Sequence, residues 1–399
     1  MSLRARERRV RSKGKVSLRQ RAPGPSVSAL LGIRLEPEGQ GRIYTAYPNL
    51  RAVRWLLPTD RPVLRQAGIR GLYQPSSLRG RALKRLVDAG ALRGENVWLE
   101  EGALATLETA MAQALGGVDI HLAFYVGVPS PQQKVTAQVL TPAGRPLAYA
   151  KIATSPLAQA AIEAEWRTLL RLSGSLRGKV PEVLDWFPWR GGKVLLITSG
   201  PEHVGPKKLS SVHSSFCESL LLSSAEENVF GESPMWARMK QTLLRLNTDL
   251  PDTLAALYDR ALQRLSEELG PVLLPLSLAH RDFAPWNTRL GPDGLFVFDW
   301  ERAEQGVVPL YDVFHFRAIQ AALSQRRGYR PDRRFLEHLL RRLWPEGHRH
   351  LPYLYLAYLV DMSLVYSEAQ IAAPGVGEQR VWRWFVGQID AFLKEGSPL

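Results

Sequence analysis

The sequence predicts an α+β fold in which a small antiparallel sheet precedes a mainly helical lobe. Three stretches rich in strand-forming residues, 121–127, 134–140 and 147–152, follow one another and are separated by turns that contain Pro and Gly. Further along, apolar residues recur at helical spacing over 253–269, and the aromatic-rich segment 335–393 is also helical in pattern. Strands grouped before helices are typical of an α+β fold.

The chain has 399 residues, which is more than one compact core usually holds, so we expect several domains. We predict a disordered basic tail at 1–25, a small mixed α/β extension of unknown role at 26–117, a sheet lobe at 118–201 and a helical lobe at 202–399. The single cysteine, Cys217, excludes an intramolecular disulfide and a cysteine-based zinc site. No apolar stretch approaches the roughly 20 residues that cross a bilayer, and no secretory signal is evident, so we expect a cytoplasmic protein.

The first 21 residues carry nine Lys or Arg and one acidic residue, so this tail holds +8 of the net charge of +14. It has almost no apolar side chains to bury, and for that reason we expect it to be disordered on its own. Nucleic acid or an anionic surface is a possible partner of the tail alone. A solvated leader or a misassigned start codon is the simpler interpretation.

The extension contains no motif that carries chemistry. Short apolar runs broken by Gly and Pro over 30–47 predict a strand or two. A helix should begin near Leu78 with Ser76 or Ser77 as its cap, and another should cover 100–115. The many arginines of this segment are most simply a solvated face.

Lys151 lies inside the third predicted strand among small and apolar residues. A lysine in such a place requires an anion nearby, because an unpaired buried charge is costly. The alternative is an edge-strand lysine that blocks further strand pairing. A helix is predicted next, since Ser155-Pro156 is a favourable helix start and 158–172 is rich in helix formers.

The stretch 278–301 concentrates polar residues around a predicted hairpin. His280 and Asp282 are followed by Asn287, and Asp299 closes the apolar run 295–298. A Gly-Pro-Asp-Gly turn at 291–294 would bring the 282–287 loop and Asp299 together. Phosphoryl transfer needs such a group, with one Asp to orient the attacking hydroxyl and an Asn and a second Asp to hold Mg²⁺. The alternative is a polar hairpin whose side chains make only turn contacts.

The spacing H-x-D-x-x-x-x-N, with an Asp after the hairpin, is the catalytic-loop pattern of kinases. With Pro285-Trp286-Asn287 in the loop and Asp299-Trp300-Glu301 in place of D-F-G, the chain resembles the aminoglycoside phosphotransferase and choline kinase family of small-molecule kinases. The resemblance covers 118–399 and implies a two-lobe protein-kinase-like fold. It also implies ATP and Mg²⁺ as cofactors and a small molecule with a hydroxyl group as the acceptor.

The resemblance implies a role for each motif residue. Asp282 would be the catalytic base, and Asn287 and Asp299 would be the Mg²⁺ ligands. Lys151 would clamp the α- and β-phosphates, with Glu165 as the better match for its partner and Glu163 as the alternative. The resemblance further implies loop support by His280 and Asp312, a hinge at the adenine that includes Thr198, Ser199 and Gly200, and a phosphate contact by Ser130.

The sequence departs from the kinase pattern before the second strand. The G-x-G-x-x-G motif is absent, and Pro129 and Pro131 offer no N–H groups, so a backbone cradle for phosphates would be thinner here. A catalytically silent kinase-like binding module is therefore one alternative function.

The acceptor is not identified by the sequence. Asp312 follows Asp299 by thirteen residues, which leaves no room for the long segment on which protein kinases dock a peptide, so a protein kinase is the less favoured alternative. Candidate acceptor contacts are Glu304, Asp361, Glu368 and Trp382. Because the C-terminal helices lack a dense acidic run, a sugar, an amino alcohol or a glycan precursor is as plausible as an aminoglycoside. The oligomeric state is left open.

Overall fold

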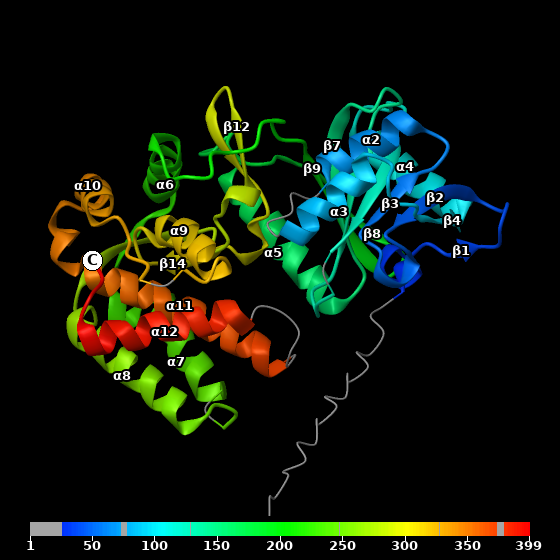
Figure 1. Cartoon of the computed structure of the whole chain (residues 1–399). Helices are drawn as coiled ribbons and strands as arrows, with labels where there is room; N and C mark the ends of the chain where they lie inside the picture. Colours follow the sequence, from blue (N-terminus) through cyan, green and yellow to red (C-terminus); the bar gives the residue numbers. More distant parts are fainter. Residues whose placement is uncertain (1–25, 73–77, 128, 247, 327, 373–378) are drawn as a thin grey trace, which may run out of the picture.

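The computed structural model describes residues 26–72, 78–127, 129–246, 248–326, 328–372 and 379–399. A sheet lobe and a helical lobe lie side by side (Figure 1). The predicted α+β class and its two lobes are therefore confirmed. The basic tail 1–25 and the predicted caps Ser76 and Ser77 lie outside the described residues.

The sheet lobe is built on one nine-stranded antiparallel sheet with the order β1-β4-β2-β3-β5-β6-β7-β9-β8. The three strands predicted from the sequence are β5, β6 and β7, and consecutive ones pair as expected. The strands span Leu35–Glu36 (β1), Arg42–Tyr47 (β2), Trp55–Pro58 (β3), Glu95–Leu99 (β4), His121–Val126 (β5), Val135–Leu140 (β6), Pro146–Ala153 (β7), Val183–Trp189 (β8) and Gly192–Thr198 (β9).

The segment 26–117 is continuous with the sheet lobe. Strand β3 pairs with β5, with Leu56 opposite Phe124, so the sheet crosses the boundary predicted at residue 117. One buried apolar cluster also contains residues from both sides of that boundary, among them Leu56, Leu104 and Val139. The reason is physical, because β5 without β3 would be an exposed edge beside an apolar face.

This continuity predicts the cost of a substitution in the extension. Leu56 is fully buried, so Leu56→Ala is expected to lower the free energy of unfolding by about 2–5 kcal/mol. Leu35→Ala, at an exposed position of the same sheet, is expected to change it by about 0.5 kcal/mol or less. Urea unfolding followed by circular dichroism should show one shifted transition. Two transitions, of which only one responds to Leu56→Ala, would mean that 26–117 folds as a separate unit.

Several helices of the sheet lobe begin where the local sequence supplies a cap or a proline. In α5, Ser155 Oγ accepts a hydrogen bond from Ala158 N and a proline occupies the first turn, as predicted. The helices α3 and α4 also match the predicted positions, whereas α1 and α2 were not predicted. The helical segments span Val27–Leu31 (α1), Leu50–Ala52 (η1), Pro62–Gly71 (α2), Leu78–Asp88 (α3), Glu101–Ala114 (α4) and Pro156–Leu172 (α5).

The helical lobe also contains short strands. A three-stranded sheet has the order β10-β11-β14, and β12 and β13 form the predicted hairpin. These strands span Glu226–Val229 (β10), Leu273–Ala279 (β11), Thr288–Gly291 (β12), Gly294–Val297 (β13) and Glu304–Val307 (β14). The small sheet was not predicted; its strand β11 separates the predicted helix α8 from the loop that carries Asp282.

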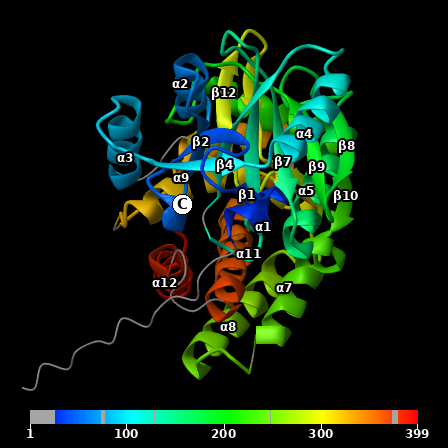
Figure 2. The same ribbon diagram turned by 90° about the vertical axis from the view of Figure 1, so that its right-hand side faces the viewer.

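Seven α-helices of this lobe lie within the described residues. They are Ser211–Ser224 (α6), Pro234–Leu246 (α7), Asp252–Glu268 (α8), Tyr311–Leu323 (α9), Arg333–Leu343 (α10), Leu351–Ala372 (α11) and Gln379–Glu395 (α12), with 3-10 turns at Phe230–Glu232 (η2), Pro285–Asn287 (η3), Trp300–Arg302 (η4) and Pro345–His350 (η5). Figure 2 shows α7, α8, α11 and α12 gathered at the end of the molecule away from the sheet, where α11 contacts the other three. No helix in the described part of the chain is long and apolar enough to span a membrane.

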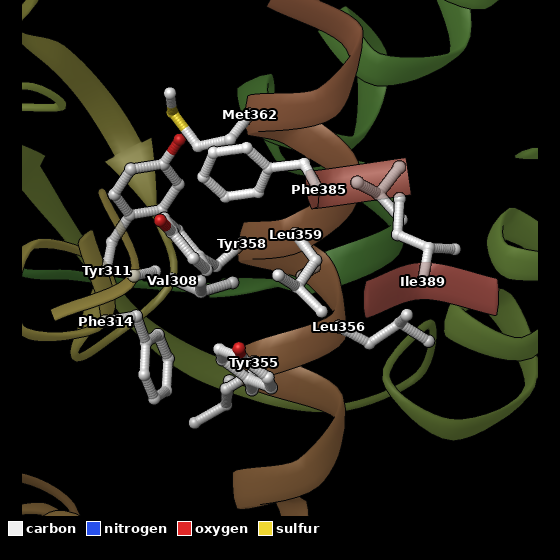
Figure 3. Close-up of a cluster of buried hydrophobic side chains, with 14 of the residues drawn as sticks. Val308, Tyr311, Phe314, Tyr355, Leu356, Tyr358, Leu359, Met362, Phe385 and Ile389 are labelled. Atoms are coloured by element: carbon white, nitrogen blue, oxygen red, sulfur yellow. The ribbon is translucent and has the colours of Figure 1, made fainter. Parts of the chain in front are cut away.

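Aromatic side chains fill the centre of the helical lobe (Figure 3). Tyr311 and Phe314 of α9 meet Tyr358 and Tyr355 of α11 edge to face, with ring centroids 5.0 and 5.2 Å apart. Phe385 of α12 packs against Tyr358. These contacts fix α9 against α11, and α9 in turn contacts the loop that carries Asp282.

Candidate active site

The hairpin of β12 and β13 gathers the polar residues at one end. Asn287 is buried in η3, and its Nδ2 donates to both the backbone oxygen and Oδ2 of Asp282, at 2.9 Å each. Phe298 N donates to Asn287 O at 3.1 Å, which brings the end of β13 to the same loop. The loop carrying Asp282 and Asn287 therefore lies beside Asp299, as the turn composition predicted.

Asp299 has a left-handed backbone conformation, with φ 73° and ψ 58°. Such a conformation is uncommon for a residue other than glycine and is frequent at functional sites, although Asp tolerates it better than most residues. The next residue, Trp300, is fully buried, and its indole N–H donates to Val297 O at 2.9 Å. The buried indole anchors the turn, while the Asp299 side chain remains about 30% exposed.

Lys151 links the sheet lobe to the hairpin. Its Nζ lies 2.5 Å from Glu165 Oε2 on α5 and 2.5 Å from Asp299 Oδ1. Trp300 N donates to the other oxygen of Glu165 at 3.3 Å. Glu163, the alternative partner, instead pairs with Arg167 at the surface. The structure thus brings Lys151, Glu165 and Asp299 together.

The charges in this triad are mutually dependent. Burial by itself lowers the pKa of Lys151, but the carboxylates of Asp299 and Glu165 outweigh it and raise the pKa. For Asp299, burial acts to raise the pKa, and Lys151 and Lys134 hold it well below the usual range. Burial raises the pKa of Glu165 more than Lys151 lowers it. Asp299 is therefore an ionised carboxylate at neutral pH.

Lys134 and Glu301 also belong to this site, and the sequence analysis gave them no role. Lys134 precedes β6, and its Nζ contacts Glu301 Oε2, with both side chains largely buried. Glu165, Asp299 and Glu301 each offer an oxygen atom within 4.8 Å of the others. Glu301 could have been found from the sequence as the acidic residue two positions after Asp299.

The oxygen donors at this site fit Mg²⁺, which prefers carboxylate and carboxamide oxygens and keeps several waters. Asn287 donates through its nitrogen to Asp282, so its Oδ1 is the atom suited to a metal. Asp299 offers Oδ2, because Oδ1 accepts from Lys151. These two residues are the ones that would hold the ion.

His280 and Asp312 fix the backbone of the catalytic loop. Asp312, at the start of α9, accepts hydrogen bonds from His280 N at 2.7 Å and Arg281 N at 2.9 Å. The His280 ring donates through Nε2 to Phe298 O at 3.0 Å and accepts from Asp282 N at Nδ1. Burial raises the pKa of Asp312. Both contacts are those expected of loop-supporting residues.

The predicted hinge residues follow β9. Thr198 ends the strand, and its Oγ1 accepts from Glu182 N at 3.0 Å. A Cβ at Gly200 would lie 2.4 Å from the ring of Phe296 in β13, so the chain at Ser199 and Gly200 passes close to the hairpin, where only glycine fits. Ser130 is exposed in the turn before β6, where its carbonyl accepts from Gln133 N.

Asp361, predicted to contact the acceptor, is buried among charged and hydroxyl partners. Its side chain is about 3% exposed and accepts from Arg281 Nη2 at 2.7 Å, Arg238 Nη2 at 3.1 Å and the Tyr311 hydroxyl at 2.6 Å. Burial acts to raise its pKa, but the two guanidinium groups hold the pKa below the usual value of 3.8. Asp361 is therefore a structural partner of two arginines.

The other three acceptor candidates have different surroundings. Glu304 is partly exposed and lies 3.2 Å from Arg238 and 3.4 Å from Arg281. Glu368 pairs with Arg245 at the surface, at 2.6 Å. Trp382 packs against the core of the helical lobe, and its indole N–H donates to Ser367. Of the four candidates, Glu304 and Asp361 contact Arg281, which precedes Asp282 in its loop.

Asp361→Asn is expected to lower the free energy of unfolding by about 3–5 kcal/mol, because it removes the buried carboxylate shared by Arg238 and Arg281 and leaves both guanidinium groups to the partly exposed Glu304. Glu368→Gln is the matched control, since its pair with Arg245 is exposed and should contribute about 0–1 kcal/mol. The Asp361 effect should be present above pH 4 and fade as pH falls through the lowered folded-state pKa. Urea unfolding at several pH values measures the destabilisation by each variant and its dependence on pH. Equal effects of the two variants would contradict the assignment.

The family model of phosphotransferase enzymes matches residues 223–350, a segment that contains Asp282, Asn287 and Asp299. No curated protein matches the chain. A thermostable mutant of aminoglycoside phosphotransferase APH(4)-Ia, solved with ADP and hygromycin B, is 16% identical over 73% of this chain and 99% of that chain, with a TM-score of 0.49. A choline kinase from Cryptosporidium parvum is 11% identical over 73% and 95%, with a TM-score of 0.48. The resemblance predicted from the sequence is confirmed.

Proposed function

From the family match and the geometry of the site, we propose that this protein is an ATP-dependent phosphotransferase that moves the γ-phosphoryl group to a hydroxyl group of a small molecule. The observation that carries the proposal is the position of Asp299. It bonds to Lys151 of the sheet lobe and stands beside the loop that carries Asp282 and Asn287. Phosphoryl transfer depends on this kind of placement of charges around the phosphates.

Each residue then has a defined task. Lys151, held by Glu165, binds the α- and β-phosphates, and Asn287 and Asp299 hold Mg²⁺. When bound, the ion neutralises charge on the phosphate oxygens. Asp282 orients the acceptor hydroxyl and takes its proton as the new O–P bond forms and the bond between the γ-phosphorus and the bridging oxygen breaks. The products are the phosphorylated acceptor and ADP.

A small acceptor is favoured by the chain that follows Asp299. This segment forms η4 and then β14, which pairs with β11, and α9 begins at Tyr311. It is therefore incorporated into the lobe and offers no long segment on which a peptide could dock. Glu304, which is partly exposed and lies 3.4 Å from Arg281, places a carboxylate beside the loop that carries Asp282.

The proposal is tested by the rate of ADP formation from Mg·ATP in the presence of amino alcohols, sugars and aminoglycosides, each compared with water as acceptor. We expect at least one acceptor class to raise the rate above that with water, and EDTA to abolish it. A chain that binds Mg·ATP but forms no ADP with any acceptor or with water would be a catalytically silent binding module, and the enzymatic proposal would be wrong.

A further inference from the structure

His315 is a buried histidine that points at the proposed catalytic carboxylate. It lies on α9, is about 1% exposed, and its Nε2 is 3.6 Å from Asp282 Oδ1. Within the described part of the chain, this fully buried Nε2 has no hydrogen-bond partner. Buried polar atoms are rarely left unpaired in native proteins, so an orphaned atom aimed at a functional group calls for an explanation.

The contact of the other ring nitrogen is compatible with a proton on Nε2. The Tyr358 hydroxyl of α11 lies 3.3 Å from His315 Nδ1. Burial raises the pKa of Tyr358 well above its usual value, so the hydroxyl keeps its proton and can donate it to Nδ1. In neutral imidazole, acceptance at Nδ1 places the ring proton on Nε2. The reverse tautomer would set an unprotonated nitrogen against a carboxylate oxygen, which is unfavourable.

Helix α9 therefore contacts the loop that carries Asp282 through two of its residues. Asp312 and His315 are three residues apart and lie on one face of α9. Asp312 fixes the loop backbone through His280 and Arg281, and His315 faces the side chain of Asp282. The polar groups that face His315 from its surroundings are Asp282 on the loop, Asp312 on its own helix and Tyr358 on α11.

We propose that His315 is a positioning residue that donates Nε2–H to Oδ1 of Asp282. The inference rests on the proposed function, in which Asp282 is the base. Asn287 already donates to Oδ2, so the two donors together would fix the plane of the carboxylate. A carboxylate oxygen can accept more than one hydrogen bond, which leaves room for the acceptor hydroxyl. The 3.6 Å separation exceeds hydrogen-bond length, and catalytic contacts of this kind tighten when substrate binds.

The first test is spectroscopic and needs no acceptor. The full chain, labelled with ¹⁵N at its eight histidines, reports the tautomer of each ring in long-range ¹H–¹⁵N spectra. His315→Gln assigns the His315 signals. We expect His315 to be protonated at Nε2 and its Nε2 resonance to move in Asp282→Asn. The control is buried His213, whose Nδ1 accepts from Ser210 N and whose signals should not move. Protonation of His315 at Nδ1, or no response to Asp282→Asn, would overturn the proposal.

The second test separates positioning from folding by the rate of Mg·ATP hydrolysis with water as acceptor. His315→Phe keeps a ring but no donor, and kcat should fall about 10- to 100-fold with an unchanged KM for ATP. His315→Gln keeps an N–H donor and should recover most of that loss. Equal kcat in wild type and His315→Phe would overturn the role. If the wild type forms ADP neither with water nor with any of the acceptors tested above, the proposed function fails, while the spectra still decide whether His315 and Asp282 interact.

Discussion

Asp282→Asn is expected to lower the kcat of phosphoryl transfer by about 10²- to 10⁴-fold, which is the usual contribution of a general base. The amide has nearly the same shape as the carboxylate, but it cannot take a proton from the acceptor hydroxyl. It can still accept a hydrogen bond from Asn287, so the loop should keep its form. Binding of Mg·ATP, which depends on Lys151, Asn287 and Asp299, should change little.

Asp293→Asn is the matched control. It makes the same chemical change in the same hairpin, at an exposed position of the turn between β12 and β13. Initial rates of ADP formation give kcat for each variant, and the thermal shift on adding Mg·ATP reports nucleotide binding. A kcat for Asp282→Asn within a few-fold of that for Asp293→Asn would show that Asp282 is not the base.

Lys151→Met is expected to lower both the stability of the fold and its response to Mg·ATP. The substitution removes the cation between Glu165, which is fully buried, and Asp299, which is partly buried. Breaking a buried ion pair by removing one partner typically costs about 3–5 kcal/mol. Mg·ATP should also cease to stabilise the variant at concentrations that stabilise the wild type. Urea unfolding and thermal shift measure the two effects.

The double variant Lys151→Met, Glu165→Gln isolates the cause. If the cost of Lys151→Met comes from the uncompensated carboxylate of Glu165, adding Glu165→Gln should recover at least about 1 kcal/mol of the lost free energy of unfolding. Coupling of this size is expected for residues in contact. Glu163→Gln, on the exposed side of the same helix, is the matched control and should recover nothing. Additive losses from Lys151→Met and Glu165→Gln would mean that the lysine stabilises the fold by packing alone.

The pH range of this effect follows from the directions of the pKa shifts. Lys151 has a raised pKa in the folded state, so its stabilisation is complete below the unfolded value of 10.5 and is lost as pH rises through the folded value. Asp299 has a lowered pKa, so its stabilisation is present above 3.8 and is lost as pH falls. Glu165 has a raised pKa in the folded state, so its ionisation lowers the stability of the fold above pH 4.5. The penalty of Lys151→Met should therefore grow as pH rises above 4.5, because protonation of Glu165 at lower pH relieves the uncompensated charge.

The hairpin and the strand of Lys151 could be predicted because their signals are local. The Gly-Pro-Asp-Gly turn and the alternating strands require only neighbouring residues, and the sequence spacing then fixes where Asp282, Asn287 and Asp299 meet. The pairing of β3 with β5 could not be predicted in this way. Each strand is only 4–6 residues long, and pattern alone does not select its partner.

Contacts between distant segments account for the rest of the differences. Asp361 is an acidic residue in an aromatic-rich helix, a pattern equally compatible with a binding site and with a buried ion pair. Its partners Arg238 and Arg281 are 123 and 80 residues away in the sequence. Lys134 and Glu301 are 167 residues apart. Only the fold reveals which of these charges are paired and which remain available to a ligand.

The central claim is that Asp299 places Mg·ATP against Lys151. The most direct measurement is the thermal shift of the wild type and of Asp299→Asn on titration with ATP, with and without Mg²⁺. The account predicts stabilisation of the wild type that requires Mg²⁺ and is strongly reduced in Asp299→Asn. Equal stabilisation of both proteins, or none in the wild type, would contradict it.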